Sequence, residues 1–227
     1  MNEIIPIPAK FEAQANISKA DYEALYKESI TDPEGFWARM ARERLTWTKE
    51  WDTVLENDFA SSKVSWFRGG KLNASYNCLD RHIDTIGDKT ALIWEGDSPN
   101  ESRKLTYREL LHEVCRLANG LSSLGIEAGD RVALYLPMLA EGVIATHACG
   151  LLGAVQVPLF SGLAANAISA RLVDGEVKAV IVADGALRRG QVHRLKETLD
   201  LALADSPSVE HVIVQARFAK ISVQLDF

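Results

Sequence analysis

The chain has 227 residues, of which 47% are hydrophobic and 25% are charged. This composition is ordinary for a globular protein and excludes disorder over most of the chain, because enough apolar side chains are present to build a core. The 25 basic and 31 acidic residues give a formal charge of −6. That balance argues against nucleic acid as a partner, since binding a phosphate backbone requires clustered Lys and Arg.

The termini and apolar runs give no sign of a membrane partner. The first ten residues have neither the basic start nor the apolar centre of a signal peptide. The longest mostly apolar stretch, residues 142–160, is interrupted by three glycines, a histidine, a glutamine and a proline. A membrane span needs about 20 continuous apolar residues, so we read this stretch as a buried helix followed by a buried strand.

The cysteines and histidines predict no metal site and no disulfide framework. The three cysteines stand more than 30 positions apart, and no Cys-x-x-Cys pair or His/Cys cluster occurs. An odd number of cysteines fits a reducing compartment, so we expect a cytoplasmic protein. None of the five histidines has metal-ligand spacing, and no residue is predicted to be catalytic.

Residues 1–86 predict an extended N-terminal segment. They contain four of the five tryptophans and few aliphatic runs. Ser18, followed by Asp21, predicts the start of one helix, and residues 31–34 predict a capping box with a proline in the first turn of a second. We expect an irregular stretch next, ending at a glycine pair, and then a short helix over residues 77–85.

Residues 87–215 alternate between short apolar runs and helical patterns. The expected strands cover residues 91–94, 104–105, 131–136, 154–159, 178–182 and 211–214. Thr106 with Glu109 predicts a capping box whose helix ends at Gly125. Further helices are expected over residues 139–152, 166–173 and 191–203.

This alternation predicts the fold class. Strands separated by helices indicate βαβ units, and continuously apolar strands are typical of a parallel sheet covered on both faces. We therefore expect an α/β, doubly wound, mostly parallel sheet with an irregular helical N-terminal extension. The expected divisions are residues 1–86, 87–215 and a tail, 216–227, in which alternating apolar residues predict a strand.

One basic segment is the best local candidate for a binding site. Arg188, Arg189, Gly190 and Gln191 follow the strand expected over 178–182 and are expected to precede a helix directly. Ligands of open α/β sheets bind beyond the carboxyl ends of the strands, and arginines beside a helix N-terminus suit a phosphate. The alternative is a solvated basic turn.

A second candidate follows the strand expected over residues 154–159. Phe160, Ser161 and Gly162 lie where an aromatic side chain can form a wall of a base or acyl pocket. A phenylalanine at the edge of the core, beside a turn, is the alternative. Cys78, Asp80 and His82 are better read as a helix-surface cluster than as a triad, since nucleophile and base usually come from different segments.

The ordered set of motifs resembles the N-terminal portion of AMP-forming acetyl-CoA synthetases, which belong to the adenylate-forming enzyme superfamily. The resemblance runs from about residue 5 to residue 214. It is carried by Trp66-Phe67, Leu72-Asn73, Asn77-Cys78-Leu79-Asp80-Arg81-His82, Ile93-Trp94-Glu95-Gly96-Asp97, Thr106-Tyr107, Pro137-Met138, Gly153-Ala154-Val155, Phe160 with Gly162, and Ala183-Asp184 with Arg188 and Gly190.

The resemblance implies an acetate–CoA ligase. Such enzymes use Mg-ATP to convert acetate to acetyl-adenylate and pyrophosphate, and coenzyme A (CoA) then displaces AMP. In this family the position of Arg188 to Gln191 meets the CoA phosphates, and the Phe160 to Gly162 turn lies near the CoA adenine. Two departures stand out: Gln191 replaces a basic residue, and Ser161-Gly162-Leu163 replaces the usual Gly-Gly-Phe.

The resemblance also shows what this sequence does not contain. It has none of the segments with which the family binds the ATP phosphates, adenine, ribose and Mg²⁺. We therefore expect a truncated or frame-shifted chain that is inactive alone, with residues 216–227 unmatched. The alternatives are a stand-alone CoA- or nucleotide-binding module and one half of a split ligase completed by a C-terminal half.

Overall fold

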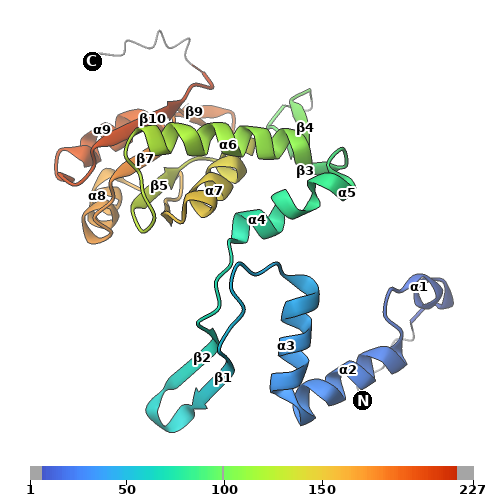
Figure 1. Cartoon of the computed structure of the whole chain (residues 1–227). Coiled ribbons are helices and arrows are strands. Elements are labelled where there is room, and N and C mark those ends of the chain that lie inside the picture. The colour runs from blue at the N-terminus through green and yellow to red at the C-terminus, as the bar shows by residue number, and fades with distance from the viewer. Residues whose placement is uncertain (1–6, 99, 219–227) are drawn as a thin grey trace, which may run out of the picture. The chain divides into compact units, whose positions relative to one another are not determined.

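A computed structural model describes residues 7–98 and 100–218 and divides the chain into two compact units between Leu72 and Asn73 (Figure 1). The distribution of tryptophans and apolar runs along the sequence predicts a later boundary, after residue 86. Asn73 explains the difference, because its side-chain amide donates hydrogen bonds to the carbonyls of Gly150 at 2.9 Å and Leu151 at 3.2 Å. Residues 73–86 therefore belong with the second unit.

The first unit contains helices and one hairpin. Its elements are α1 (Ala9–Gln14), α2 (Lys19–Thr31), α3 (Pro33–Arg44), β1 (Thr53–Asp58), the 3₁₀ turn η1 (Phe59–Ser61) and β2 (Lys63–Arg68). The capping box of Ser18 and Asp21 is confirmed. The box expected at residues 31–34 is wrong, because Asp32 caps α3 by accepting from the Gly35 N–H at 3.0 Å, whereas Thr31 is the last residue of α2.

The expected irregular stretch before the glycine pair is largely the antiparallel hairpin β1–β2. Its strands are mostly exposed or half-buried, so they lack the apolar alternation from which a strand is predicted. An aromatic cluster adjoins it, with the Phe67 ring 4.8 Å from Trp51 and 5.5 Å from Trp47. Gly70 is required here, since a Cβ would lie 2.7 Å from the Trp47 ring.

The second unit begins with three short helical pieces in place of the one helix expected over residues 77–85. They are α4 (Ala74–Cys78), the 3₁₀ turn η2 (Asp80–His82) and α5 (Ile83–Ile86). Leu79 interrupts the helix with φ −122° and ψ −68°, and its side chain is buried. An antiparallel pair follows, formed by β3 (Thr90–Glu95) and β4 (Ser102–Thr106).

The remaining elements alternate between helices and strands. They are α6 (Tyr107–Ser123), β5 (Arg131–Tyr135), α7 (Ala140–Leu152), β6 (Val155–Pro158), α8 (Ala165–Asp174), β7 (Ala179–Ala183), β8 (Ala186–Arg188), β9 (Gln191–His193), α9 (Leu195–Leu203) and β10 (His211–Gln215). The capping box of Thr106 and Glu109 is confirmed. The strand expected in the tail falls largely on residues 219–227, which lie outside the described residues.

Four parallel strands form the central sheet in the order β10-β7-β5-β6. Successive side chains of β5 enter opposite cores, since Val132 and Leu134 pack with α6 and α7, whereas Ala133 and Tyr135 pack with α8 and α9. Helices thus cover both faces, and the predicted α/β class is confirmed (Figure 1).

The helix expected over residues 191–203 begins at Leu195 instead. Residues 186–193 form the antiparallel hairpin β8–β9, in which Arg188 pairs with Gln191. In the part of the chain that the structure describes, no helix is long and apolar enough to cross a membrane.

Candidate functional site

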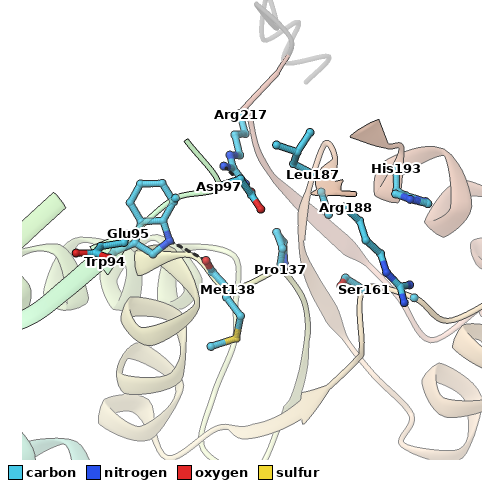
Figure 2. Close-up of a pocket in the computed structure, with 13 residues that line it drawn as sticks. Trp94, Glu95, Asp97, Pro137, Met138, Ser161, Leu187, Arg188, His193 and Arg217 are labelled. Atoms are coloured by element: carbon cyan, nitrogen blue, oxygen red, sulfur yellow. Dashed lines mark hydrogen bonds and ion pairs between the residues drawn. The ribbon is translucent and has the colours of Figure 1, made fainter. Parts of the chain in front are cut away.

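A cavity of about 460 Å³ lies at the carboxyl edge of the parallel sheet (Figure 2). The helices that follow β5 and β7 pack on opposite faces of the sheet, α7 on one and α9 on the other. Such a divergence opens a crevice at the strand ends, the usual ligand position of open α/β sheets. The walls of this cavity come from the end of β3, the loops after β5 and β6, the β8–β9 hairpin and the segment after β10. The lining residues are Trp94, Glu95, Gly96, Asp97, Pro137, Met138, Ser161, Gly162, Ala186, Leu187, Arg188, His193 and Arg217.

Arg217 connects the segment after β10 to the β3–β4 region and to the end of β7. Its guanidinium forms ion pairs with Glu101 at 3.2 Å and Asp97 at 3.6 Å, and it lies 5.7 Å from the Trp94 ring centroid. The Trp94 indole N–H in turn donates to the Met138 carbonyl at 2.7 Å (Figure 2). The Arg217 backbone N–H donates to the Asp184 carboxylate at 3.0 Å. These bonds hold loops from distant parts of the sequence around one cavity.

Tyr135, the last residue of β5, anchors the loop after β6 through a hydrogen bond. Its buried hydroxyl donates to the Leu163 carbonyl at 3.5 Å. Burial raises the pKa of Tyr135, so the phenol remains a neutral donor at physiological pH. The loop that carries Phe160 and Gly162 is therefore tied to the central strand.

The basic segment forms the tip of a hairpin and does not begin a helix, which corrects the sequence-based expectation. Arg189 and Gly190 have φ values of 51° and 76°. Positive φ at both central residues is typical of a two-residue type I′ turn, whose twist matches that of the flanking strands. The turn directs Arg188 and Gln191 to the same face, since they are a cross-strand pair.

Among the residues that the structure describes, Arg188 and Arg189 are the two arginines whose side chains have no hydrogen-bond or ion-pair partner. Neighbouring arginines are engaged: Arg194 binds Glu197 at 3.0 Å, and Arg217 has the two ion pairs given above. A guanidinium without a carboxylate partner is available to an anion, and its planar donors match phosphate oxygens.

Gly162 lies beside one of these free arginines. A Cβ built on Gly162 would stand 3.4 Å from the Arg188 Nη1 atom, so the guanidinium lies against this turn. Figure 2 shows Arg188 extending from the hairpin toward Ser161. The structure thus brings together residues of both predicted segments, the 188–191 segment and the 160–162 turn.

The other predicted residues line two further cavities. Arg188, Arg189, Gln191 and His193 line a cavity of about 350 Å³ on the hairpin. Phe160 is 80% exposed and lines an apolar groove of about 480 Å³ with Met138 and Val143. Ser161 lines both this groove and the cavity of about 460 Å³, so Phe160 is a neighbour of the arginine site and not one of its walls.

Sequence reasoning missed His193 and Arg217 as lining residues. His193 was read as part of a helix, and only the hairpin register, which pairs it with Ala186, places it on the face of Arg188. Arg217 follows the last strand of the sheet, and that position was the signal that could have identified it. The described residues contain no group of three or more His, Cys, Asp or Glu that could hold a metal ion.

Comparison with known proteins matches residues 22–78 to the family model for the acetyl-coenzyme A synthetase N-terminus and residues 79–224 to that for AMP-binding enzymes. The second match extends beyond residue 215, where the sequence resemblance was expected to stop.

Curated relatives cover nearly the whole chain. The acetyl-coenzyme A synthetase of Leptospira biflexa is 50% identical over 95% of this chain and 33% of its own length. The enzyme of Bdellovibrio bacteriovorus is 44% identical over 98% of this chain and 35% of its own length. The enzyme of Alkalilimnicola ehrlichii is 42% identical over 95% of this chain and 33% of its own length. The chain therefore spans about a third of the length of these relatives. Together with the fold and the strand-end cavity, these matches confirm the resemblance: the chain belongs to the AMP-binding enzyme family.

Proposed function

We propose that this chain supplies the CoA-binding part of an acetate–CoA ligase. The observation that carries the proposal is a pair of arginines, Arg188 and Arg189, that have no partner among the described residues and lie at the carboxyl edge of the sheet. The chain's relatives are named acetyl-coenzyme A synthetase. The reaction joins acetate, ATP and CoA into acetyl-CoA, AMP and pyrophosphate. An acetate oxygen attacks the α-phosphorus and displaces pyrophosphate, and the CoA sulfur then attacks the acetyl carbon and displaces AMP.

The chain's own residues would bind and orient the nucleotide end of CoA. Arg188 extends over Gly162 and can donate two parallel N–H bonds to phosphate oxygens, and Arg189 supplies a second guanidinium at the turn. Gly190 has the positive φ of 76° that completes the turn, and the Gln191 amide can donate but cannot neutralise charge. Phe160 offers an exposed ring on which the CoA adenine can stack.

We assign ATP and Mg²⁺ to no residue of this chain. The described residues lack a ligand cluster for a metal, and the sequence contains no Gly-rich phosphate loop. We expect these sites in the two thirds of the relatives' length that this sequence does not match. Because the described cysteines are free thiols, we place the protein in a reducing compartment, the cytoplasm.

Titration calorimetry of the 227-residue chain with CoA tests the proposal. Binding should weaken about tenfold in Arg188→Ala and Arg189→Ala, the usual scale for losing one charge-assisted contact to an anion. Arg194→Ala is the matched control, since Arg194 lies three residues beyond the turn and already pairs with Glu197. Absence of CoA binding, or equal affinity in all three variants, would contradict the assignment.

A pyrophosphate-release assay separates the two alternatives kept from the sequence. A stand-alone binding module binds CoA and releases no pyrophosphate under any condition. One half of a split ligase releases acetate-dependent pyrophosphate only when a C-terminal half is co-expressed. We expect the 227-residue chain alone to release none, and robust turnover by the purified chain would overturn that expectation.

A further inference from the structure

His193 and Arg188 both line two of the cavities described above. These are the cavity of about 460 Å³ at the strand ends and the cavity of about 350 Å³ on the hairpin. The hairpin register explains why: Arg188 pairs with Gln191, and Ala186 pairs with His193 two residues further along the ladder. Alternate residues of a strand share one face, so the imidazole and the guanidinium lie on the same side of the hairpin (Figure 2).

The His193 side chain is exposed and available. No hydrogen bond, ion pair or ring contact involves its imidazole among residues 7–98 and 100–218. The hairpin from residue 186 to residue 193 contains no acidic residue. A protonated imidazole donates from both ring nitrogens and would form, with Arg188 and Arg189, a cluster of three unpartnered cations on a chain whose formal charge is −6.

We propose that His193 is a third phosphate-binding group of this site and that it makes the affinity for phosphate depend on pH. The proposal rests on the proposed CoA function and deepens it. Gln191, at the neighbouring position on the same face, can donate a hydrogen bond but supplies no charge. Histidine is the side-chain type whose charge can change between pH 5 and 8, so a phosphate held by His193 would bind with an affinity that depends on pH.

Other charged groups line the cavity of about 460 Å³, and their effect on CoA binding must be distinguished from that of the imidazole. Arg188 and Arg217 remain cationic throughout this range, and Asp97 is engaged by Arg217. Glu95 also lines the cavity, and among the described residues no ion pair neutralises it. The variant Glu95→Gln separates the two groups: a pH dependence of CoA binding that persists in this variant belongs to the imidazole, and one that disappears would overturn the proposal.

The test measures CoA affinity of the full chain by calorimetry between pH 6.5 and 8.5 at constant ionic strength. A phosphate monoester is largely dianionic in this window, so changes in affinity report mainly on the protein. Wild type should bind CoA about fivefold more weakly at pH 8.5 than at pH 6.5, the scale of one exposed ion pair. His193→Gln should bind weakly at every pH, and His193→Lys should bind tightly at every pH.

Two ligands and one control make the result specific. His112→Gln, which removes an exposed imidazole on α6, should behave as wild type. Loss of the pH dependence with 3′-dephospho-CoA places the imidazole at the 3′-phosphate, and its retention places the imidazole at the diphosphate; both support the proposal. The same dependence with pantetheine, which has no phosphate, would overturn it.

The proposal and the function it rests on fail in different ways. If CoA binds and depends on Arg188 but His193→Gln keeps the wild-type pH dependence, His193 is not a phosphate ligand and the proposed function stands. If CoA does not bind to any variant at any pH, both are overturned. Circular dichroism of His193→Gln and His193→Lys should match wild type, since the side chain is exposed.

Discussion

The two edges of the parallel sheet differ because, among the described residues, arginines without a partner lie only at the carboxyl edge. At the amino edge, Lys178 binds Asp130 at 3.0 Å, and Arg131 binds Glu176 at 3.2 Å and the Gly175 carbonyl at 2.8 Å. At the carboxyl edge, Arg188 and Arg189 have no partner among the described residues. The first arrangement stabilises the fold. The second leaves donors available, which is what an anion-binding site requires, and this difference supports the proposed site at the carboxyl edge.

The largest effect should come from the core that both edges share. Leu199 of α9 is fully buried, whereas Leu201 on the same helix is 71% exposed. Leu199→Ala should lower the free energy of unfolding by about 3 kcal/mol through lost transfer energy and a residual cavity. Leu201→Ala is the control and should change it by less than about 0.5 kcal/mol. Urea unfolding measures both, and equal losses would contradict the assigned packing.

A smaller effect is expected at the hairpin tip, where function opposes stability. Arg189 has φ 51°, a conformation that costs a residue with a Cβ about 1 kcal/mol. Arg189→Gly should therefore raise the free energy of unfolding of this region while it weakens CoA binding. Hydrogen exchange of the hairpin amides and calorimetry measure the two quantities. A variant that loses stability would show that the turn is not strained at this position.

The smallest effect should appear at the amino edge, as a pH dependence. The Glu127 backbone N–H at 2.9 Å and the Lys178 ammonium hold the pKa of Asp130 below its usual range. A lowered carboxyl pKa contributes stability above about pH 4, and that contribution is lost as the pH falls through the folded-state pKa. Asp130→Asn should thus be less stable than wild type at pH 6 and approach wild type near pH 2.

Thermal unfolding at several pH values checks this prediction. The control is Asp88→Asn, because Asp88 is 90% exposed in its pair with Arg108 and such pairs contribute little. The expected order at pH 6 is wild type and Asp88→Asn together, with Asp130→Asn below both. CoA affinity should be the same in all three. A change in affinity on altering Asp130 would break the separation of the two edges.

Most of the central architecture follows from local sequence patterns. The capping boxes at Ser18 and Thr106 and the apolar strands of the sheet are where periodicity placed them. These features depend on neighbours within a few residues, so a single segment carries the whole signal. The two hairpins were missed because exposed strands such as β2 and β9 have no apolar face to reveal them.

Local patterns along the chain were enough to predict the fold class, the family and the two segments at the strand ends. Which residues meet there depends on the three-dimensional fold: Arg188 lies over Gly162, His193 lies on the face of Arg188, and Arg217 pairs with Asp97. The physical reason is that these contacts depend on the positive φ values of one turn and on the order of the strands in the sheet. Neither is encoded in the spacing of any single segment.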